Sequence, residues 1–205
     1  GLGDVYKRQA VIYKCLIDMM GAEHIWIPGV HMTRGIAYEY AEQMKLLKGG
    51  HNFENDILMA AKNIGKRYAV NRPHVQNLEM TALAMFDATK KMHGMKERER
   101  LLLQMAVMLH DVGKYISFNN VADSSYNIIM SNEIIGLSHI EREMVALIAR
   151  YNTVTLPSYD ELVMESSLSA EQYLTVSELT AIVRLANALD RSHLQKIQAC
   201  LLYTS

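Results

Sequence analysis

The chain has only two cysteines in its 205 residues, Cys15 and Cys200. Two thiols are too few for a disulfide framework, and their scarcity fits a protein of the reducing cytoplasm. An apolar run of the roughly 18 residues that a membrane-spanning helix needs is also lacking, and we find no signal peptide. Neither sign of charge is in excess, because 21 Lys and Arg residues face 22 Asp and Glu residues. This balance excludes a general attraction to nucleic acid or to anionic membrane, so any phosphate binding has to be local.

What the chain does have is apolar residues, which make up half of it and are enough for a sizeable core. The most apolar stretch, residues 101–109, contains Gln104 as its only polar residue and predicts a helix buried on nearly every side. It ends abruptly in His110 and Asp111. We expect Gly113 to take the left-handed conformation that commonly closes a helix, so that a pocket can open beside the His–Asp pair.

A carboxylate at the inner end of a core helix is costly unless it has a partner, and a divalent cation bound by imidazole and carboxylate removes that cost. Two other polar residues are predicted to point inward. His74 lies four residues before Leu78 on one helical face, and Asp190 lies eleven residues after Leu179 on an apolar stripe. The predicted ligands are therefore His74, His110, Asp111 and Asp190. Each of the two outlying residues, taken alone, could instead be a polar group at a helix end that faces solvent.

Such a mixed set of imidazoles and carboxylates suits Mn, Fe, Zn or Mg, with coordination positions left open for water and substrate. In an active site His110 and Asp111 would help the metal to activate a water molecule. Four nearby side chains are candidate phosphate contacts: Lys114, Arg150, Arg191 and His193. For Lys114 the competing interpretation is a solvated lysine, and for the other three it is ordinary surface pairing.

The spacing of apolar residues predicts a mainly α fold, with at least five helices between Asn52 and Ala199 and at most a short strand near Ile25. Ser138 with Glu141, and Ser169 with Gln172, are candidate capping boxes. We expect one helix to run from Pro73 to Met92 and to stop at Gly94. Residues 119–125 are expected to form a polar loop, and residues 153–167 a loop or an irregular connection.

The pattern of His74, His110–Asp111 and Asp190 resembles that of the HD superfamily of metal-dependent phosphohydrolases. Three flanking blocks make the resemblance closer: His110–Ser117, Glu133–His139 with Ala149–Tyr151, and Ala186–His193. They resemble the C-terminal HD domain of the Ppx/GppA exopolyphosphatase and guanosine pentaphosphate phosphatase family. The resemblance covers roughly residues 10–199. It implies an enzyme that hydrolyses phosphoanhydride bonds of polyphosphate or of (p)ppGpp-type substrates, with the HD domain binding metal and polyanion. Many HD domains carry further histidines where this chain has residues 123–126, so one metal ion is expected rather than two.

The resemblance also implies a division of the chain. Residues 10–48 resemble the C-terminal remnant of an actin-like ATPase-fold domain, a short α/β piece, and residues 49–199 the HD domain, with Lys48–Gly50 as the linker. The alternative for the first segment is an independent helix and hairpin packed on the core. The ends, residues 1–9 and 200–205, look like translated adaptor sequence. The residues that cleave polyphosphate are expected to belong to domains upstream of Ala10.

Three functions remain open at this stage. The first is the C-terminal part of an exopolyphosphatase or guanosine pentaphosphate phosphatase, which the flanking blocks favour. The second is a self-sufficient HD phosphohydrolase that acts on a nucleotide or another phosphorylated small molecule, which the complete ligand set favours. The third is a non-catalytic helical module for dimerisation or regulation, and a homodimer is possible. The sequence upstream of Ala10 would distinguish the first of these from the others.

Overall fold

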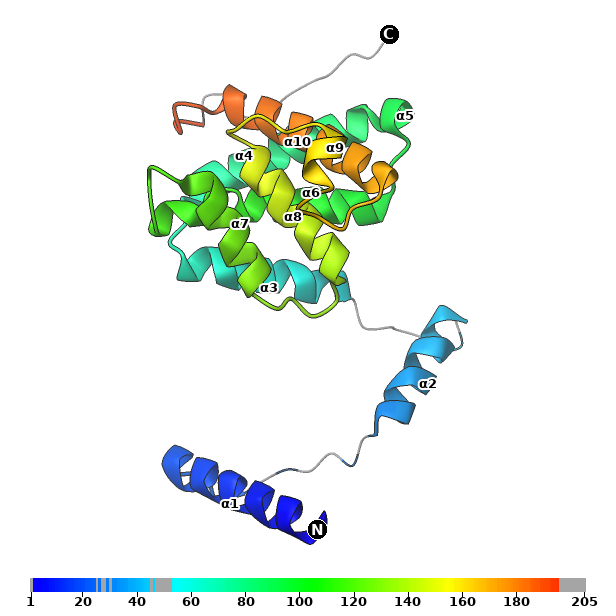
Figure 1. Cartoon of the computed structure of the whole chain (residues 1–205), viewed down its shortest axis with the longest axis vertical. Helices are drawn as coiled ribbons and strands as arrows, with labels where there is room; N and C mark the ends of the chain where they lie inside the picture. Colours follow the sequence, from blue (N-terminus) through cyan, green and yellow to red (C-terminus); the bar gives the residue numbers. More distant parts are fainter. Residues whose placement is uncertain are drawn as a thin grey trace. The chain divides into compact units, whose positions relative to one another are not determined.

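The computed structural model describes residues 2–24, 26, 29, 31–44, 46 and 53–195. It divides into two compact units, Gly1–His51 and Asn52–Ser205. The first unit contains helices α1 (Leu2–Met20) and α2 (Met32–Gln43), shown in blue in Figure 1. α1 thus includes most of the end that the sequence interpretation set aside. Of the three residues expected to form a strand, 25–27, only Trp26 lies among the described residues, which contain no strand, so the α/β remnant stays a prediction.

The second unit is a bundle of helices, and its described residues contain no strand. Its elements are α3 (Phe53–Arg67), α4 (Arg72–Ala88), α5 (Lys90–His93), α6 (Glu97–Leu109), the 3-10 helix η1 (Val112–Tyr115), α7 (Val121–Ser131), α8 (His139–Tyr151), α9 (Tyr159–Leu162) and α10 (Ala170–Leu189). The mainly α prediction, with at least five helices in this region, is confirmed. No helix among the described residues is long and apolar enough to cross a membrane.

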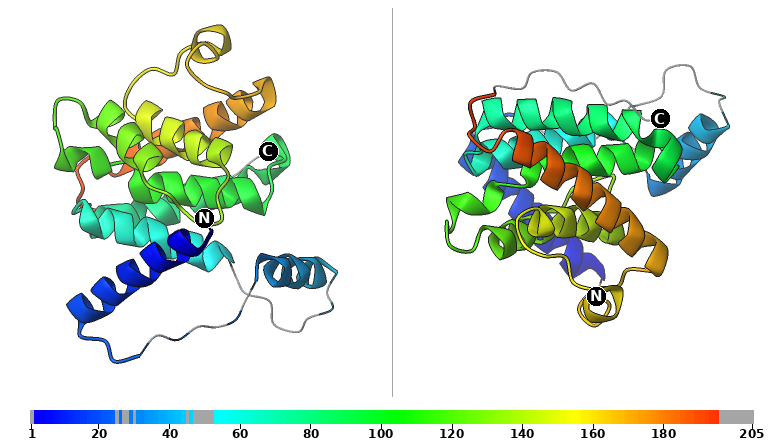
Figure 2. Two further views of the ribbon diagram at one scale, coloured as in Figure 1. Left: turned by 60° about the horizontal axis from the view of Figure 1, so that its bottom comes forward. Right: turned by 90° about the horizontal axis from the view of Figure 1, so that it is seen from above.

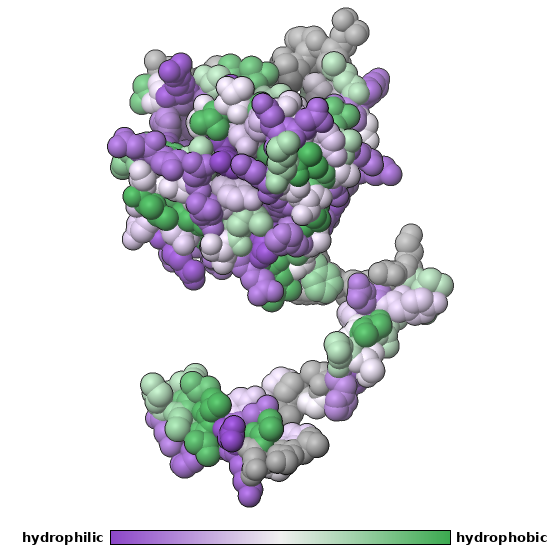
Figure 3. Space-filling model, viewed as in Figure 1, coloured by the Kyte–Doolittle hydropathy of each residue, from purple (hydrophilic) through white to green (hydrophobic). Residues whose placement is uncertain are grey.

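Helix α6 forms the centre of the bundle, where it packs against α3, α4, α8 and α10 (Figures 1 and 2). Every residue from Leu101 to Leu109 is buried except Gln104, which is half-buried and donates a side-chain hydrogen bond of 2.7 Å to Glu79. Each large apolar side chain buried in this way stabilises the fold by about 1.5–3 kcal/mol. The prediction of a core helix with one polar residue is confirmed. On the face that Figure 3 shows, hydrophilic and hydrophobic residues are intermixed over the bundle.

Serine capping boxes begin three helices of the bundle. In those of α8 and α10 the serine hydroxyl accepts from the backbone N–H three residues later, and the acidic or amide side chain at that position accepts from the serine N–H. In that of α9 the N–H and the hydroxyl of Ser158 both donate to Glu161. The two predicted boxes, Ser138 with Glu141 and Ser169 with Gln172, are confirmed. A third box, Ser158 with Glu161, was not predicted. The third box starts α9 inside the stretch expected to be irregular. Asn52, where the region expected to hold at least five helices begins, lies outside the described residues.

Two expected element boundaries were wrong. The helix expected from Pro73 to Met92 is interrupted at Thr89, whose hydroxyl donates to the carbonyl of Met85 at 2.7 Å and competes with the helical pattern. Gly94 ends the short α5 in the left-handed conformation, as expected. The polar loop expected over residues 119–125 is shorter than predicted, because α7 already begins at Val121. Ser125 within that helix is fully buried, and its bonding partners are remote in sequence.

Gly113 is not left-handed, so the sequence interpretation of this residue was wrong. It lies in η1, where its N–H donates to Ser125 Oγ at 3.0 Å, and the same hydroxyl donates to the carbonyl of His110 at 3.1 Å. A Cβ added at Gly113 would meet the backbone nitrogen of Ser125 at 2.6 Å and the carbonyl oxygen of Val121 more closely still. Glycine is required at this position because α7 packs directly against the backbone of η1. The hydrogen bonds of Ser125 then hold the segment that follows His110.

Candidate metal centre

His110 directly follows α6 and is 2% exposed. Its Nδ1 lies 2.7 Å from the carbonyl oxygen of Val107. A carbonyl oxygen can only accept, so Nδ1 carries a proton, and in the neutral ring Nε2 keeps the lone pair. This Nε2 is buried and has no hydrogen-bond partner. The backbone at the end of α6 therefore orients the imidazole with Nε2 pointing into the protein.

His74 lies in the first turn of α4, where Asn71 caps the helix by accepting from the His74 backbone N–H at 3.3 Å. The side chain is fully buried, and its Nδ1 lies 2.8 Å from Asp190 Oδ2. Burial lowers the pKa of His74 more than the hydrogen bond to Asp190 raises it, which favours the neutral ring. Because the carboxylate accepts from Nδ1, Nε2 again keeps its lone pair, and this atom too is buried without a partner.

Asp111 supplies a carboxylate beside these two rings. Its Oδ2 lies 3.4 Å from His110 Nε2 and pairs with the ammonium group of Lys114. Burial raises the pKa of Asp111, but the hydrogen bond and the charge of Lys114 oppose this effect, and the pKa lies below its ordinary range, so the carboxylate is ionised. When the His110 ring is neutral with its proton on Nδ1, the lone pair of Nε2 faces the Asp111 carboxylate oxygen 3.4 Å away. They repel unless a cation lies near both.

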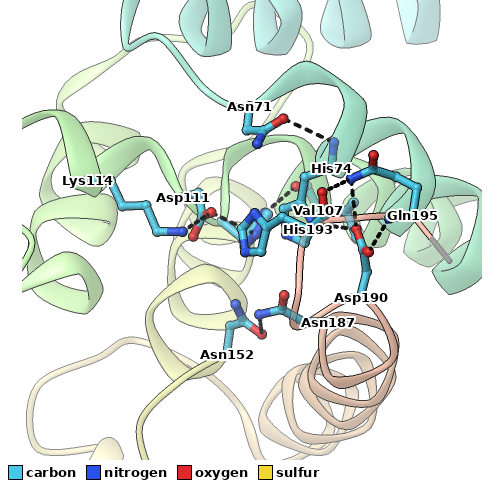
Figure 4. A network of polar contacts seen from close by, with 11 residues as sticks. Asn71, His74, Val107, Asp111, Lys114, Asn152, Asn187, Asp190, His193 and Gln195 are labelled. Atoms are coloured by element: carbon cyan, nitrogen blue, oxygen red, sulfur yellow. Dashed lines mark hydrogen bonds and ion pairs between the residues drawn. The ribbon is translucent and has the colours of Figure 1, made fainter.

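The three ligand atoms, one each from His74, His110 and Asp111, all lie within 4.8 Å of one another. Figure 4 shows the surrounding polar network, with side chains from α4, η1 and α10 directed toward one centre. Two atoms bound at about 2.1 Å from one ion are at most about 4.2 Å apart, so small side-chain adjustments would complete coordination. Two imidazole nitrogens and one carboxylate oxygen form a donor set that suits Fe, Mn or Zn with positions left open. The residues present therefore fit a divalent metal.

Asp190, the fourth predicted ligand, is not part of this group of three. One of its carboxylate oxygens accepts from His74 Nδ1, and the other accepts from the backbone N–H of Gln195 at 2.8 Å. Carboxylates placed in this way fix the tautomer and the orientation of metal-binding histidines. The geometry gives Asp190 the role of positioning His74, and its role as a direct ligand stays a prediction.

We expect Asp190→Asn to weaken metal binding by about 10- to 100-fold without abolishing it, because an amide holds the His74 ring less firmly than a carboxylate. Calorimetric titration of the apo protein with Mn²⁺ and Zn²⁺ measures this change. Asp160→Asn is the matched control, since Asp160 is exposed on α9. Unchanged affinity in Asp190→Asn would refute the positioning role, whereas complete loss of binding would make Asp190 a direct ligand.

The structure brings two of the four candidate phosphate contacts to the cluster. Lys114 pairs with Asp111, and the ring of His193 stacks on that of His74 with centroids 3.8 Å apart and planes 17° from parallel. Arg150 is held elsewhere, because it forms an ion pair of 2.8 Å with Asp123 and lies over the rings of Tyr126 and Tyr151. Arg191 is exposed just after α10. Phosphate binding by any of the four stays a prediction.

Sequence reasoning missed the amide side chains of this network. Asn152 is buried after α8, and its Oδ1 accepts from Asn187 Nδ2 at 3.4 Å, while its own Nδ2 is buried without a partner. Figure 4 shows the two amides bonded to each other. Asn187 could have been found, because it lies three residues before Asp190 and so on the same face of α10. No comparable spacing indicates Asn152.

The fold and this cluster together define an all-helical domain with a buried candidate centre of two histidines and one carboxylate. A family model described as Ppx/GppA phosphatase, domain III matches residues 58–204. The match covers well over half of the chain, so the chain belongs to the Ppx/GppA phosphatase family, and the resemblance seen in the sequence is confirmed. The matched range extends past Ala199 and overlaps the end that was interpreted as adaptor sequence. That interpretation stays a prediction.

Proposed function

We propose that the chain is the C-terminal helical part of a Ppx/GppA phosphatase that hydrolyses phosphoanhydride bonds of polyphosphate or of (p)ppGpp-type substrates. In this proposal the helical domain holds one divalent metal ion and helps to bind the polyanion. Family membership supports the class of reaction. The observation that carries the metal site is the pair of buried, unpartnered Nε2 atoms of His74 and His110, which converge with the carboxylate of Asp111.

The residues of the site have distinct tasks in this proposal. His74 and His110 remain neutral and supply nitrogen lone pairs, and Asp111 remains ionised. Lys114 lies at the edge of the site with its side chain 38% exposed, so its ammonium group can turn from Asp111 to a phosphate oxygen. A bound ion would supply a Lewis acid and lower the pKa of a bound water. His193 covers one face of the His74 ring and excludes water from that side.

The compact cluster also favours a second candidate, a self-sufficient HD phosphohydrolase that acts on a nucleotide or another phosphorylated small molecule. All three converging ligand groups belong to this bundle. If the ion activated a water molecule here, His110 and Asp111 would be catalytic residues of this domain. A non-catalytic module for dimerisation or regulation is the third candidate, and it requires neither the ion nor the free nitrogens.

We expect this chain to show little or no release of phosphate from long-chain polyphosphate or guanosine pentaphosphate with Mn²⁺ or Mg²⁺ supplied. The site offers a metal and a few cations rather than a channel for a long polyanion. Binding of polyphosphate should be weak and should fall steeply with salt, because exposed charges are screened over about 8 Å at physiological ionic strength. A colorimetric assay of released phosphate and a binding titration at two salt concentrations measure these quantities.

The same assay separates the candidate functions. Rapid release that disappears in His110→Ala but persists in His139→Ala would establish the bundle itself as the catalyst. His139 is the matched control because it is exposed at the start of α8. Absence of both metal binding and polyphosphate binding would leave only the non-catalytic module.

A further inference from the structure

A hollow lies between α3 and α4, and its lining shares no residue with the histidine cluster. Its volume is about 300 Å³, and eleven residues of α3, α4, α6 and the α3–α4 connection line it. A hollow of this size is at the lower end of the range for small-molecule sites, about 300–1,000 Å³. It can hold a ligand of mononucleotide size but not a long polymer.

Three cations line this hollow, and none of them forms an ion pair with another residue that the structure describes. They are Lys62, Lys66 and Arg72, and all three are exposed. The only acidic lining residue is Glu79, which accepts a hydrogen bond from Gln104 at 2.7 Å. Five other cations of the bundle each pair with a carboxylate: Lys90, Arg98, Arg100, Lys114 and Arg150.

The positions of these three cations favour the binding of an anion. Lys62 and Lys66 are four residues apart on α3, a spacing at which like charges on one helix face destabilise each other. Arg72 begins α4, where the positive end of the helix dipole disfavours a cation. An anion between the three groups relieves both effects at once. The positions of the charges thus indicate a negatively charged ligand.

The rest of the hollow indicates that the ligand has an apolar body as well. Ala61, Gly65, Val75 and Met108 are buried lining residues that provide an apolar floor. A Cβ added at Gly65 would come within 3.1 Å of a methyl group of Val70, so the glycine keeps this wall open. Amide side chains of Asn63 and Gln76 lie at the rim, together with Glu79. Amide and carboxylate groups can pair with the polar edge of a flat heterocycle, which inorganic phosphate lacks.

We propose that this hollow is a binding site for a nucleoside phosphate of mononucleotide size, with the phosphates held by Lys62, Lys66 and Arg72 and the base placed over the apolar floor. The site is independent of the metal centre and of the reaction proposed above. A nucleotide bound there would regulate or anchor the domain without occupying the histidine cluster.

Calorimetric titration of the whole chain with ADP, GDP and inorganic tripolyphosphate tests the proposal, in buffer with EDTA so that the metal centre does not contribute. We expect ADP or GDP to bind and to bind more tightly than tripolyphosphate. The double variant Lys62→Gln/Lys66→Gln should weaken that binding by about tenfold or more, because two charge-assisted contacts are lost. Gln76→Glu, which adds a negative charge at the rim without changing shape, should also weaken it.

Lys91→Gln is the matched control, since Lys91 is exposed on α5 and outside the hollow. It should bind the nucleotides as the unchanged protein does, and the metal content of all variants should be equal. Failure of both nucleotides to bind, or equal binding in the double variant, would overturn the proposal. Tripolyphosphate binding as tight as nucleotide binding, and lost equally in the double variant, would show a site for inorganic phosphate chains and would also contradict it.

Discussion

Replacing His110 with Ala should reduce metal binding from about one ion per chain to none. The change removes one of three converging donor groups and leaves the carboxylate of Asp111 with His74 alone. Two donors hold a divalent ion too weakly to compete with water, so the affinity should fall by at least about 100-fold. Asp111→Ala should have the same effect. Elemental analysis of the purified proteins, together with titration by Mn²⁺ and Zn²⁺, measures the loss.

His139→Ala is the matched control for this prediction, because it also removes an imidazole but from an exposed position on α8. It should keep the full metal content. The variants also need to be folded, and their helical circular dichroism should equal that of the unchanged protein. A folded His110→Ala protein with undiminished metal content would show that the three residues do not form the site.

Gly113→Ala should lower the free energy of unfolding by about 3 kcal/mol, at the upper end of what overpacking by one methyl group costs. The added Cβ would overlap backbone atoms of Val121 and Ser125, which cannot rotate away as a side-chain end can. Relief requires α7 to move, and this breaks the hydrogen bonds of Ser125 to Gly113 and to His110. Urea unfolding at constant temperature measures the difference.

Gly35→Ala is the control for Gly113→Ala, since Gly35 lies in α2 with nothing within 4 Å of an added Cβ. There the substitution should be neutral or slightly stabilising, because alanine favours a helix more than glycine does. A loss below about 0.5 kcal/mol in Gly113→Ala would mean that α7 does not pack closely on η1. The substitution should also weaken metal binding, since the displaced Ser125 no longer holds the His110 carbonyl.

Local periodicity was enough to identify the core and the inward direction of the site residues. The apolar run before His110 could only be a buried helix, because it offers no polar face to water. His74 and Asp190 were identified from their register with Leu78 and Leu179, since residues separated by whole helical turns share a face. The capping boxes were also local, because each pairs residues only three positions apart.

Contacts between distant segments could not be predicted in this way. Gly113 was assigned a left-handed role because its position after a helix is typical of one, yet the structure requires it for the approach of α7. Asn152 bonds to Asn187 only because α8 ends beside α10, and the neighbours of Asn152 in the sequence give no sign of this contact. Asp190 is not one of the three grouped donors, because it bonds to the His74 ring instead. The spacing of these residues in the sequence does not reveal this contact.

By itself, then, the sequence determined a helical bundle, its central helix, the family, and the four polar residues that point inward. These follow from interactions within one helix or from patterns within a few turns. Only the tertiary structure decided which atoms meet: the free Nε2 atoms of His74 and His110, the pairing of Arg150 with Asp123, and the three cations around one hollow. The physical reason is that register shows which way a side chain points, whereas its partner depends on how separate helices cross and pack.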